Sequence, residues 1–495
     1  MNASSNHNPP THQPGRPGAG RQFPILALAG LLLIGAAAGR STAADWPTYR
    51  FDSRRSGTTP EAIPVPLAAA WTFTSPAPPQ MAWTGPAKWD AYAKIRRLEP
   101  MRNFDPAFFV SVVGDSVYFG SSVDDAVHCL DTKTGAEKWA FLADGPVRLP
   151  PAWDQGHLYF GADDGYAYCL DAAQGNLVWK RKPSGQETLL LYNGKLVSHW
   201  PCRTGVVVQD GIAYFGASLL PWEPSYLCAV DARTGAEDGP GRYIAKLDQL
   251  TLQGAMLATD NRLILPQGRQ APEMFDRATG RSLGTFGGSG QGGIFAVVSR
   301  TGEFVHGLGQ NHATEGELRG FDAQSRDYLV TFPKATRIVV TDEIAYLNLG
   351  SELAGFARGR YVELARRQAQ LQARVKSLRE QLKKLGQQQH GPAGDPLKAE
   401  VKTIDAELAP LAGQLAACYL WKTKADYPHD LILAGTKLFA GGDDRVAAFD
   451  AATGRECWSA PVTGRANGLA VAQGRLFVST DRGTIHCFQA APGQP

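Results

Sequence analysis

Short apolar runs alternate with turns rich in Gly, Asp and Asn from Phe108 almost to the end of the chain. Runs of this length between turn residues are typical of β-strands. Their return at intervals of about 40 to 60 residues is typical of a fold built from one repeated unit. The clearest runs occupy the same place in every unit, which we interpret as its second strand: 117–119, 158–160, 212–215, 263–265, 304–305, 344–346, 438–439 and 476–478.

The most regular part of the unit is a turn that carries Asp, then Gly four residues later and, in the best copies, Trp four residues after that. The Asp side chain can accept hydrogen bonds from its own turn, and Gly can adopt the positive φ that closes it. The Trp stands on the next strand with a large apolar surface to bury. The turn residues are Asp131, Gly135, Trp139, Asp171, Gly175, Trp179, Asp231, Gly235, Asp276, Gly280, Asp450, Gly454 and Trp458.

Each unit is interpreted as four strands, with the Asp turn between the third and the fourth. The last unit ends at Phe488 without that turn or a fourth strand, whereas an apolar run around Trp71 stands alone before the first unit. A strand supplied from near the N-terminus would complete the last unit and leave no free sheet edge. The sequence therefore predicts an all-β fold, an eight-bladed β-propeller over residues 108–489, closed by the strand of Trp71, with a short tail at 490–495.

The sixth unit contains an insertion, residues 358–417, in place of its Asp turn. Apolar residues follow a heptad pattern from Tyr361 to Leu385 and again from Leu397 to Leu415, on either side of a breaker-rich loop at 386–396. This predicts an antiparallel coiled-coil hairpin of two helices, with Pro410 kinking the second. Because the two apolar stripes can bury each other, we expect the hairpin to fold separately from the propeller.

The first 44 residues have the pattern of a secretory signal. Fifteen apolar residues, Ile25 to Gly39, follow a polar segment, and the small residues Ala43 and Ala44 offer two cleavage positions. The run is shorter than the about 20 residues that cross a bilayer, which favours cleavage over a retained membrane anchor, the alternative. We expect an exported chain, periplasmic or extracellular, with no membrane span after cleavage.

Residues 45–107 hold an opening segment, the closing strand and an irregular connector. The opening segment, 45–57, is polar and turn-rich, so we expect it to lie on the surface. The connector carries a basic cluster at Lys94, Arg96 and Arg97.

Composition excludes several classes of partner and site. The net charge of +3 is too small to favour nucleic acid. Four cysteines, Cys129, Cys169, Cys228 and Cys487, occupy the same position of the repeat, on the strand before the Asp turn. This favours a role as small buried apolar residues over a role in disulfides. Acidic pairs recur in the turn between second and third strands, and are interpreted as turn residues rather than a cation site: Asp124–Asp125, Asp163–Asp164 and Asp443–Asp444.

The Asp-x-x-Thr-Gly-x-x-x-Trp turn resembles that of the pyrroloquinoline-quinone (PQQ) type propeller repeat, over about 108–489 and the strand at Trp71. The resemblance implies a superfamily of quinoprotein dehydrogenases and non-enzymatic scaffolds, such as the propeller subunit of the outer-membrane assembly machinery. Quinoprotein alcohol dehydrogenases typically have two adjacent cysteines near the cofactor. This sequence has no such pair and no Cys-x-x-Cys-His haem motif, so the resemblance to the scaffolds is favoured.

These features favour a protein-interaction or envelope-assembly scaffold that binds envelope or secreted proteins, with no catalysis and no cofactor. We assign no catalytic, cofactor-binding or metal residue. Two alternatives stay open: a PQQ-dependent oxidoreductase with PQQ and Ca²⁺ at the central channel, and a small-molecule or glycan-binding module. The basic first helix of the insertion is interpreted as a solvated surface, with docking of an anionic partner or lipid surface as the alternative.

Overall fold

The computed structural model describes residues 44–83, 103–192, 194–268, 270–288, 292–308 and 316–492. The signal segment with Ala43, the basic cluster at Lys94, Arg96 and Arg97, and the last three residues of the tail lie outside the described residues. The chain divides into units 1–40 and 41–495, and all described residues belong to the second.

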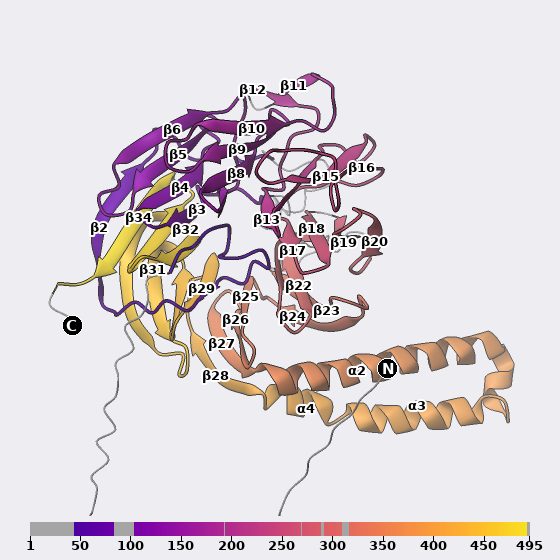
Figure 1. Cartoon of the computed structure of the whole chain (residues 1–495). Helices are drawn as coiled ribbons and strands as arrows, with labels where there is room; N and C mark the ends of the chain where they lie inside the picture. Colours follow the sequence, from indigo (N-terminus) through magenta and orange to yellow (C-terminus); the bar gives the residue numbers. More distant parts are fainter. Residues whose placement is uncertain are drawn as a thin grey trace, which may run out of the picture. The chain divides into compact units, whose positions relative to one another are not determined.

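Unit 41–495 consists largely of four-stranded antiparallel sheets, in which strands consecutive in the chain lie side by side (Figure 1). The first three sheets contain β3 (Val110–Val113), β4 (Ser116–Gly120), β5 (Ala126–Asp131) and β6 (Glu137–Leu142); β7 (Ala152–Asp154), β8 (His157–Gly161), β9 (Ala167–Asp171) and β10 (Leu177–Arg181); β13 (Val207–Gln209), β14 (Ile212–Ala217), β15 (Ser225–Asp231) and β16 (Tyr243–Leu247). The next three contain β17 (Leu257–Ala258), β18 (Arg262–Gln267), β19 (Gln270–Asp276) and β20 (Ser282–Thr285); β21 (Gly293–Val298), β22 (Glu303–Leu308), β23 (Glu317–Asp322) and β24 (Tyr328–Pro333); β25 (Arg337–Val340), β26 (Ile344–Asn348), β27 (Glu352–Ala357) and β28 (Tyr419–Lys424).

The remaining large sheet has eight strands. Its order is β1 (Thr58–Thr59), β29 (Asp430–Ala434), β30 (Lys437–Gly441), β31 (Asp443–Asp450), β32 (Glu456–Ala472), β33 (Arg475–Thr480), β34 (Thr484–Ala490) and β2 (Leu67–Thr74). The long strand β32 belongs to two halves of this sheet, because residues 456–465 pair with β31 and residues 466–472 pair with β33. The strand β2 pairs with β34 and places Trp71 opposite Cys487, where the sequence predicts the closing strand.

The first strands of successive sheets surround a central channel. Within this unit β3 lies against β7, β7 against β13, β13 against β17 and β17 against β21. One hydrophobic cluster joins β21 to β25 through Phe295, Val297 and Ile338. From there β25 lies against β29, β29 against β32, and β32 against β3. We call one end of the channel the Asp-turn face and the other, where connectors pass between sheets, the connector face.

The Asp turns hold neighbouring sheets together. Asp131 accepts hydrogen bonds from the backbone N–H groups of Lys133 and Thr134, at 3.0 and 2.9 Å, and Gly135 closes the turn with φ of 70°. The Trp71 ring from the neighbouring sheet covers this glycine, where an added Cβ would lie 2.7 Å from the ring. The same contact recurs for Trp139 on Gly175, Trp179 on Gly235, Tyr243 on Gly280 and Trp421 on Gly454. These turn residues therefore have a structural role.

The seven cysteines all lie in the described residues and none forms a disulfide. Six are buried. Burial raises the pKa of Cys169 to about 12, so its thiol stays neutral. This agrees with their interpretation as small apolar core residues.

The insertion in the sixth sheet forms a helical arm (Figure 1), which comprises α2 (Arg358–Leu385), the 3-10 helix η1 (Gly386–His390), α3 (Asp395–Leu408) and α4 (Leu411–Ala416). The second half is interrupted at Pro410, which stands just before α4. The two long helices bury Val375, Leu378 and Ile404 between them. No helix in the described ranges is both long enough and apolar enough to cross a membrane.

The expectation that the arm folds separately is wrong for the first turns of α2. Tyr361 and Ala365 belong to the same buried cluster as Phe332 and Phe356 of the propeller. The Arg358 guanidinium, also buried, pairs with Glu303 on β22. The heptad pattern did not reveal this because an aromatic residue at a heptad position can pack against a sheet as well as against a helix.

We therefore expect the distal arm, but not its root, to be dispensable for folding. Replacing residues 371–404 with a short Gly/Ser linker should leave the melting temperature within about 2 °C of the wild type, while the far-ultraviolet helical signal falls. Replacing the whole of 358–417 should lower it further, because truncating buried aromatic residues costs about 3 to 5 kcal/mol each. Circular dichroism of both variants tests this. Equal destabilisation by the two would contradict it.

Candidate functional site

The opening segment fills the channel at the Asp-turn face, which corrects the expectation that it lies on the surface. Trp46 exchanges backbone hydrogen bonds with Val112 of β3, at 2.7 and 2.8 Å. Ser53 accepts a hydrogen bond from the backbone of Ala258, and β1 pairs with β29. The inner edges of the first strands expose unpaired backbone groups, and the segment supplies their partners. Because the opening segment is mostly polar, its sequence did not predict that it lies inside the channel.

Two arginines of the opening segment, Arg50 and Arg55, are also buried inside the channel. Arg50 donates to Asp430 at 2.6 Å and lies over the Phe295 ring, with its guanidinium carbon 5.1 Å from the ring centroid. Arg55 donates to the Met256 carbonyl at 2.9 Å. A cavity of about 10 Å³ remains beside Trp46 and Arg50, which is room for one water at most. An organic cofactor does not fit there.

Four charged side chains are buried together at the connector face. Arg148 donates to Asp163 at 2.6 Å and to Asp105 at 2.7 Å. Arg203 donates to both oxygens of Asp163, at 2.8 and 2.7 Å. The turn interpretation of Asp163 was therefore incomplete, because this residue holds two arginines from neighbouring sheets.

A signal for this cluster is present in the sequence. Arg148 stands four residues before β7, and Arg203 stands four residues before β13. Gln253, four residues before β17, accepts a hydrogen bond from the Trp83 indole at 2.7 Å. In three successive sheets, a polar residue thus stands four positions before the first strand, so all three lie at the same rim of the channel. The regularity can be recognised only after the first strands have been assigned.

The electrostatics of the cluster are balanced. Burial works to raise the pKa of Asp163, but Arg148 and Arg203 outweigh it and hold the pKa well below its usual range. Burial raises the pKa of Asp105. Asp105 Oδ1 and Arg203 Nη1 have no hydrogen-bond partner in the described structure. Two carboxylates and two guanidinium groups cancel, so the cluster leaves no surplus charge for an anionic cofactor.

The described residues also do not fit a Ca²⁺ ion beside PQQ. Calcium takes six to eight oxygen ligands. No group of three or more His, Cys, Asp or Glu side chains converges as a metal site within the described ranges. Both carboxylates of the cluster are held by arginines.

The other acidic pairs behave as turn residues. Asp125 and Asp444 adopt positive φ of 60° and 54°, which Asp tolerates in turns. Asp124 bonds to His128 at 3.0 Å, and this hydrogen bond lowers the pKa of Asp124 to about 2.

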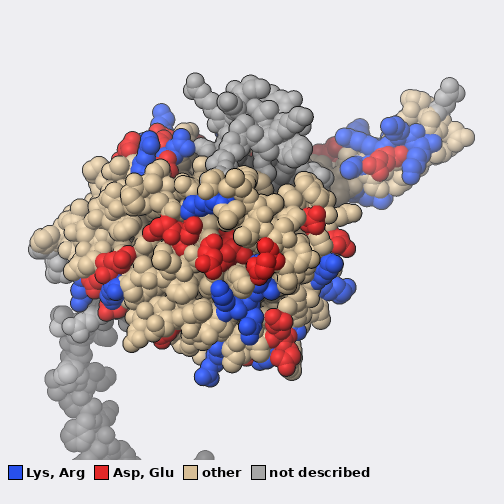
Figure 2. All heavy atoms as spheres, turned by 90° about the horizontal axis from the view of Figure 1, so that it is seen from above, with Lys and Arg blue, Asp and Glu red and all other residues tan. Residues whose placement is uncertain are grey.

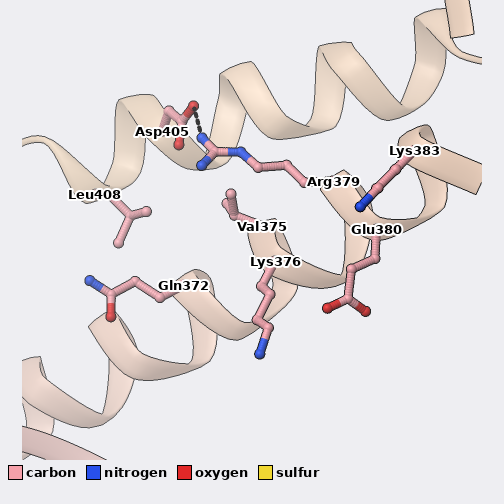
Figure 3. A pocket seen from close by; sticks show the side chains of 8 residues that line it. All are labelled: Gln372, Val375, Lys376, Arg379, Glu380, Lys383, Asp405 and Leu408. Atoms are coloured by element: carbon pink, nitrogen blue, oxygen red, sulfur yellow. Dashed lines mark hydrogen bonds and ion pairs between the residues drawn. The ribbon is translucent and has the colours of Figure 1, made fainter.

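The arm carries most of its basic residues on the surface (Figure 2). Three ion pairs cross from α2 to α3, at 3.1, 2.7 and 3.5 Å: Arg367–Glu407, Arg374–Glu400 and Arg379–Asp405. A groove of about 470 Å³ lies between the helices, where Figure 3 shows Arg379 reaching across to Asp405 beside Val375 and Leu408. These pairs neutralise three arginines of α2 within the arm.

A two-stranded hairpin on the connector side, β11 (Leu189–Tyr192) and β12 (Lys195–Ser198), was not predicted from the sequence. Its Leu191 and Leu196 lie opposite each other and are 77% and 58% exposed. Trp222, in the loop between β14 and β15, is 71% exposed. The Asn-Gly pair at 193–194 is a known hairpin signal that the repeat pattern overshadowed. Large apolar side chains exposed together on one hairpin, as Leu191 and Leu196 are, are typical of protein contact surfaces.

Comparison with known proteins shows that the chain is similar to PQQ-like repeat proteins over part of its length. A family model described as outer membrane protein assembly factor BamB matches residues 71–239 and 442–495. The chain is also similar to a polyvinylalcohol dehydrogenase from Sphingopyxis sp. (strain 113P3), at 31% identity over 137 residues. That match covers 25% of this chain and 20% of the relative, so the chain spans about a fifth of the relative's length.

Solved structures share the fold at low identity. The quinohemoprotein alcohol dehydrogenase from Comamonas testosteroni has a TM-score of 0.54 and 15% identity, covering 92% of this chain and 82% of that one. BamB from Moraxella catarrhalis has a TM-score of 0.48 and 13% identity, covering 86% and 99%. The match to the family model confirms the resemblance to the PQQ-like repeat. Because the similar proteins include an assembly factor and dehydrogenases, function is argued from the residues of this chain.

Proposed function

We propose that this protein is an exported, eight-bladed propeller that acts as a protein-interaction scaffold in the cell envelope, without catalysis of its own. The blade count treats the eight-stranded sheet as two blades, because β32 pairs with β31 through one half and with β33 through the other. The helical arm then stands as a coiled-coil hairpin in the sixth blade.

The observation that carries the proposal is the filling of the channel by the chain itself. Quinoprotein chemistry needs room for a cofactor and substrate at the channel, whereas residues 44–59 occupy its Asp-turn end, where the cavity beside Trp46 and Arg50 holds about 10 Å³. The features that remain open to a large partner lie outside the channel: the leucines of the β11–β12 hairpin with Trp222, and the helical arm.

The family model supports a partner in the envelope. Its description as an outer membrane assembly factor names a protein that assembles other proteins. The matched residues, 71–239, include the β11–β12 hairpin, so the exposed leucines fall within the matched part of the chain. We propose that this hairpin contacts a partner protein through apolar side chains and that the arm adds a second contact.

A quinoprotein oxidoreductase is the second candidate. The local identity to a dehydrogenase favours it, as do the two unpartnered atoms on Asp105 and Arg203 at the connector face. Against it stand the balanced charge of that cluster and the absence of a converging ligand set in the described ranges.

A cofactor assay separates the two candidates. The purified exported chain is mixed with PQQ and Ca²⁺, and dye reduction is followed with a panel of alcohols, polyvinyl alcohol and sugars. We expect no turnover above the protein-free control, because the described residues do not form a binding site for PQQ and Ca²⁺. Saturable binding of PQQ together with turnover would overturn the scaffold proposal.

A further inference from the structure

A buried carboxylate faces the start of the described chain. Glu61 is 2% exposed and accepts a hydrogen bond from the backbone N–H of Ala44 at 2.8 Å. It accepts two more from Gln473, at 3.1 Å, and Gly474, in the turn between β32 and β33. Over the described residues, no Lys, Arg or His side chain forms an ion pair with Glu61. A buried ionised carboxylate of this kind is costly without a cation.

The segment that follows Ala44 is fixed to the same place. The Ala44 carbonyl accepts a hydrogen bond from Gln473 at 3.2 Å. Asp45 accepts hydrogen bonds from the Gln473 side chain at 2.8 Å and from Gly114 at 2.9 Å, which join the last blade to the first. Trp46 then begins the filling of the channel. The nitrogen of Ala44 is thus held against Glu61 by contacts on both sides.

We propose that the signal segment is cut between Ala43 and Ala44, and that the new α-ammonium group of Ala44 becomes the cation partner of Glu61. This inference rests on the proposed export of the chain. Ser41 and Ala43 provide the small residues that a signal peptidase requires three and one positions before the cut. A cut one residue later would remove Ala44 and leave Glu61 without this donor.

The chemistry is a simple hydrolysis. A signal peptidase breaks the bond between the Ala43 carbonyl carbon and the Ala44 nitrogen with one water. The water oxygen remains on the Ala43 carboxylate, and the nitrogen is released as an amine that takes up a proton at neutral pH. An amide N–H is thereby replaced by an ammonium group at the same position, so a hydrogen bond to the carboxylate becomes a hydrogen-bonded ion pair. Processing therefore strengthens the attachment of the opening segment and the junction that it makes between the first and last blades.

The first test is the N-terminus of the exported protein, determined by intact mass and N-terminal sequencing. We expect the chain to begin at Ala44. A chain that begins at Asp45 would overturn this inference and leave the scaffold proposal intact. A chain that retains the signal segment would overturn both the inference and the export on which it rests.

The second test asks whether charge at position 44 is coupled to Glu61. Melting temperatures are compared for chains that begin at Ala44 or carry Gly-Ser ahead of it, each with and without Glu61→Gln. We expect the Gly-Ser extension to lower the melting temperature by about 2 °C or more when Glu61 is present. It should have less than half that effect in the Glu61→Gln background. Equal effects in both backgrounds would overturn the pairing, and so would the absence of any effect.

Discussion

Asp163→Asn is expected to destabilise the propeller by about 3 to 5 kcal/mol, the usual cost of removing one partner from a buried ion pair. The substitution leaves Arg148 and Arg203 buried beside a neutral amide, and both guanidinium groups lie within 3 Å of Asp163 in the native protein. Chemical denaturation of the exported chain measures the change. Asp443→Asn is the matched control: it alters the corresponding turn acid of another blade, which is 67% exposed, and should change stability by less than about 0.5 kcal/mol.

The same residue gives the stability a defined pH dependence. The arginines hold the pKa of Asp163 below that of an unfolded aspartate, which is about 3.9. Its contribution is therefore complete above the unfolded pKa and is lost as the pH falls below it. We expect wild type and Asp163→Asn to differ strongly at pH 7, to begin to converge as the pH falls below about 4, and to become equal only below the depressed folded-state pKa of Asp163. A constant difference across this range would show that the carboxylate charge is not what stabilises the cluster.

Trp71→Ala should destabilise the whole propeller by about 2 to 4 kcal/mol, slightly less than for a fully buried Trp because the ring is half-buried. The side chain joins the closing strand to the first sheet: its ring covers Gly135, and its indole donates to the Thr132 carbonyl at 2.9 Å. Loss of this contact loosens the junction between the two ends of the chain, so unfolding should remain a single transition at a lower midpoint.

Trp222→Ala provides the control for this substitution. Trp222 is 71% exposed, so its removal should shift the midpoint little. If Trp71→Ala melts within a degree of the wild type, the closing strand does not stabilise the ring. A separate early transition would mean that the last blade unfolds alone.

Local turn chemistry made most of the fold predictable. An Asp that accepts from the backbone of its own turn, followed by Gly with positive φ, needs no distant residue to be recognised. The position of the closing strand followed from counting strands. The last unit lacked a fourth strand, and the isolated apolar run before the first unit carries Trp71, as the fourth strands of the best repeats carry a Trp. The structure places β2 against β34 accordingly.

What the sequence did not reveal depends on contacts between distant residues. Arg50 and Arg55 are polar, so they suggested a surface segment. Inside the channel they satisfy Asp430 and the Met256 carbonyl, which lie far away in the sequence. Asp163 stands in a turn like its counterparts, and only its neighbours Arg148 and Arg203 make it different. Such pairings become visible only when the blades are brought together.

The measurement that tests the scaffold proposal most directly is copurification from the envelope of the native cell. A C-terminally tagged chain is compared with an untagged strain, with Leu191→Asp/Leu196→Asp in the hairpin, and with the arm shortened by replacement of 371–404. Melting temperatures confirm that the variants are folded. The proposal predicts envelope proteins enriched by the wild type and reduced at least tenfold by the hairpin variant, with a further loss when the arm is shortened. No enrichment over the untagged strain, or equal enrichment by the wild type and both variants, would contradict it.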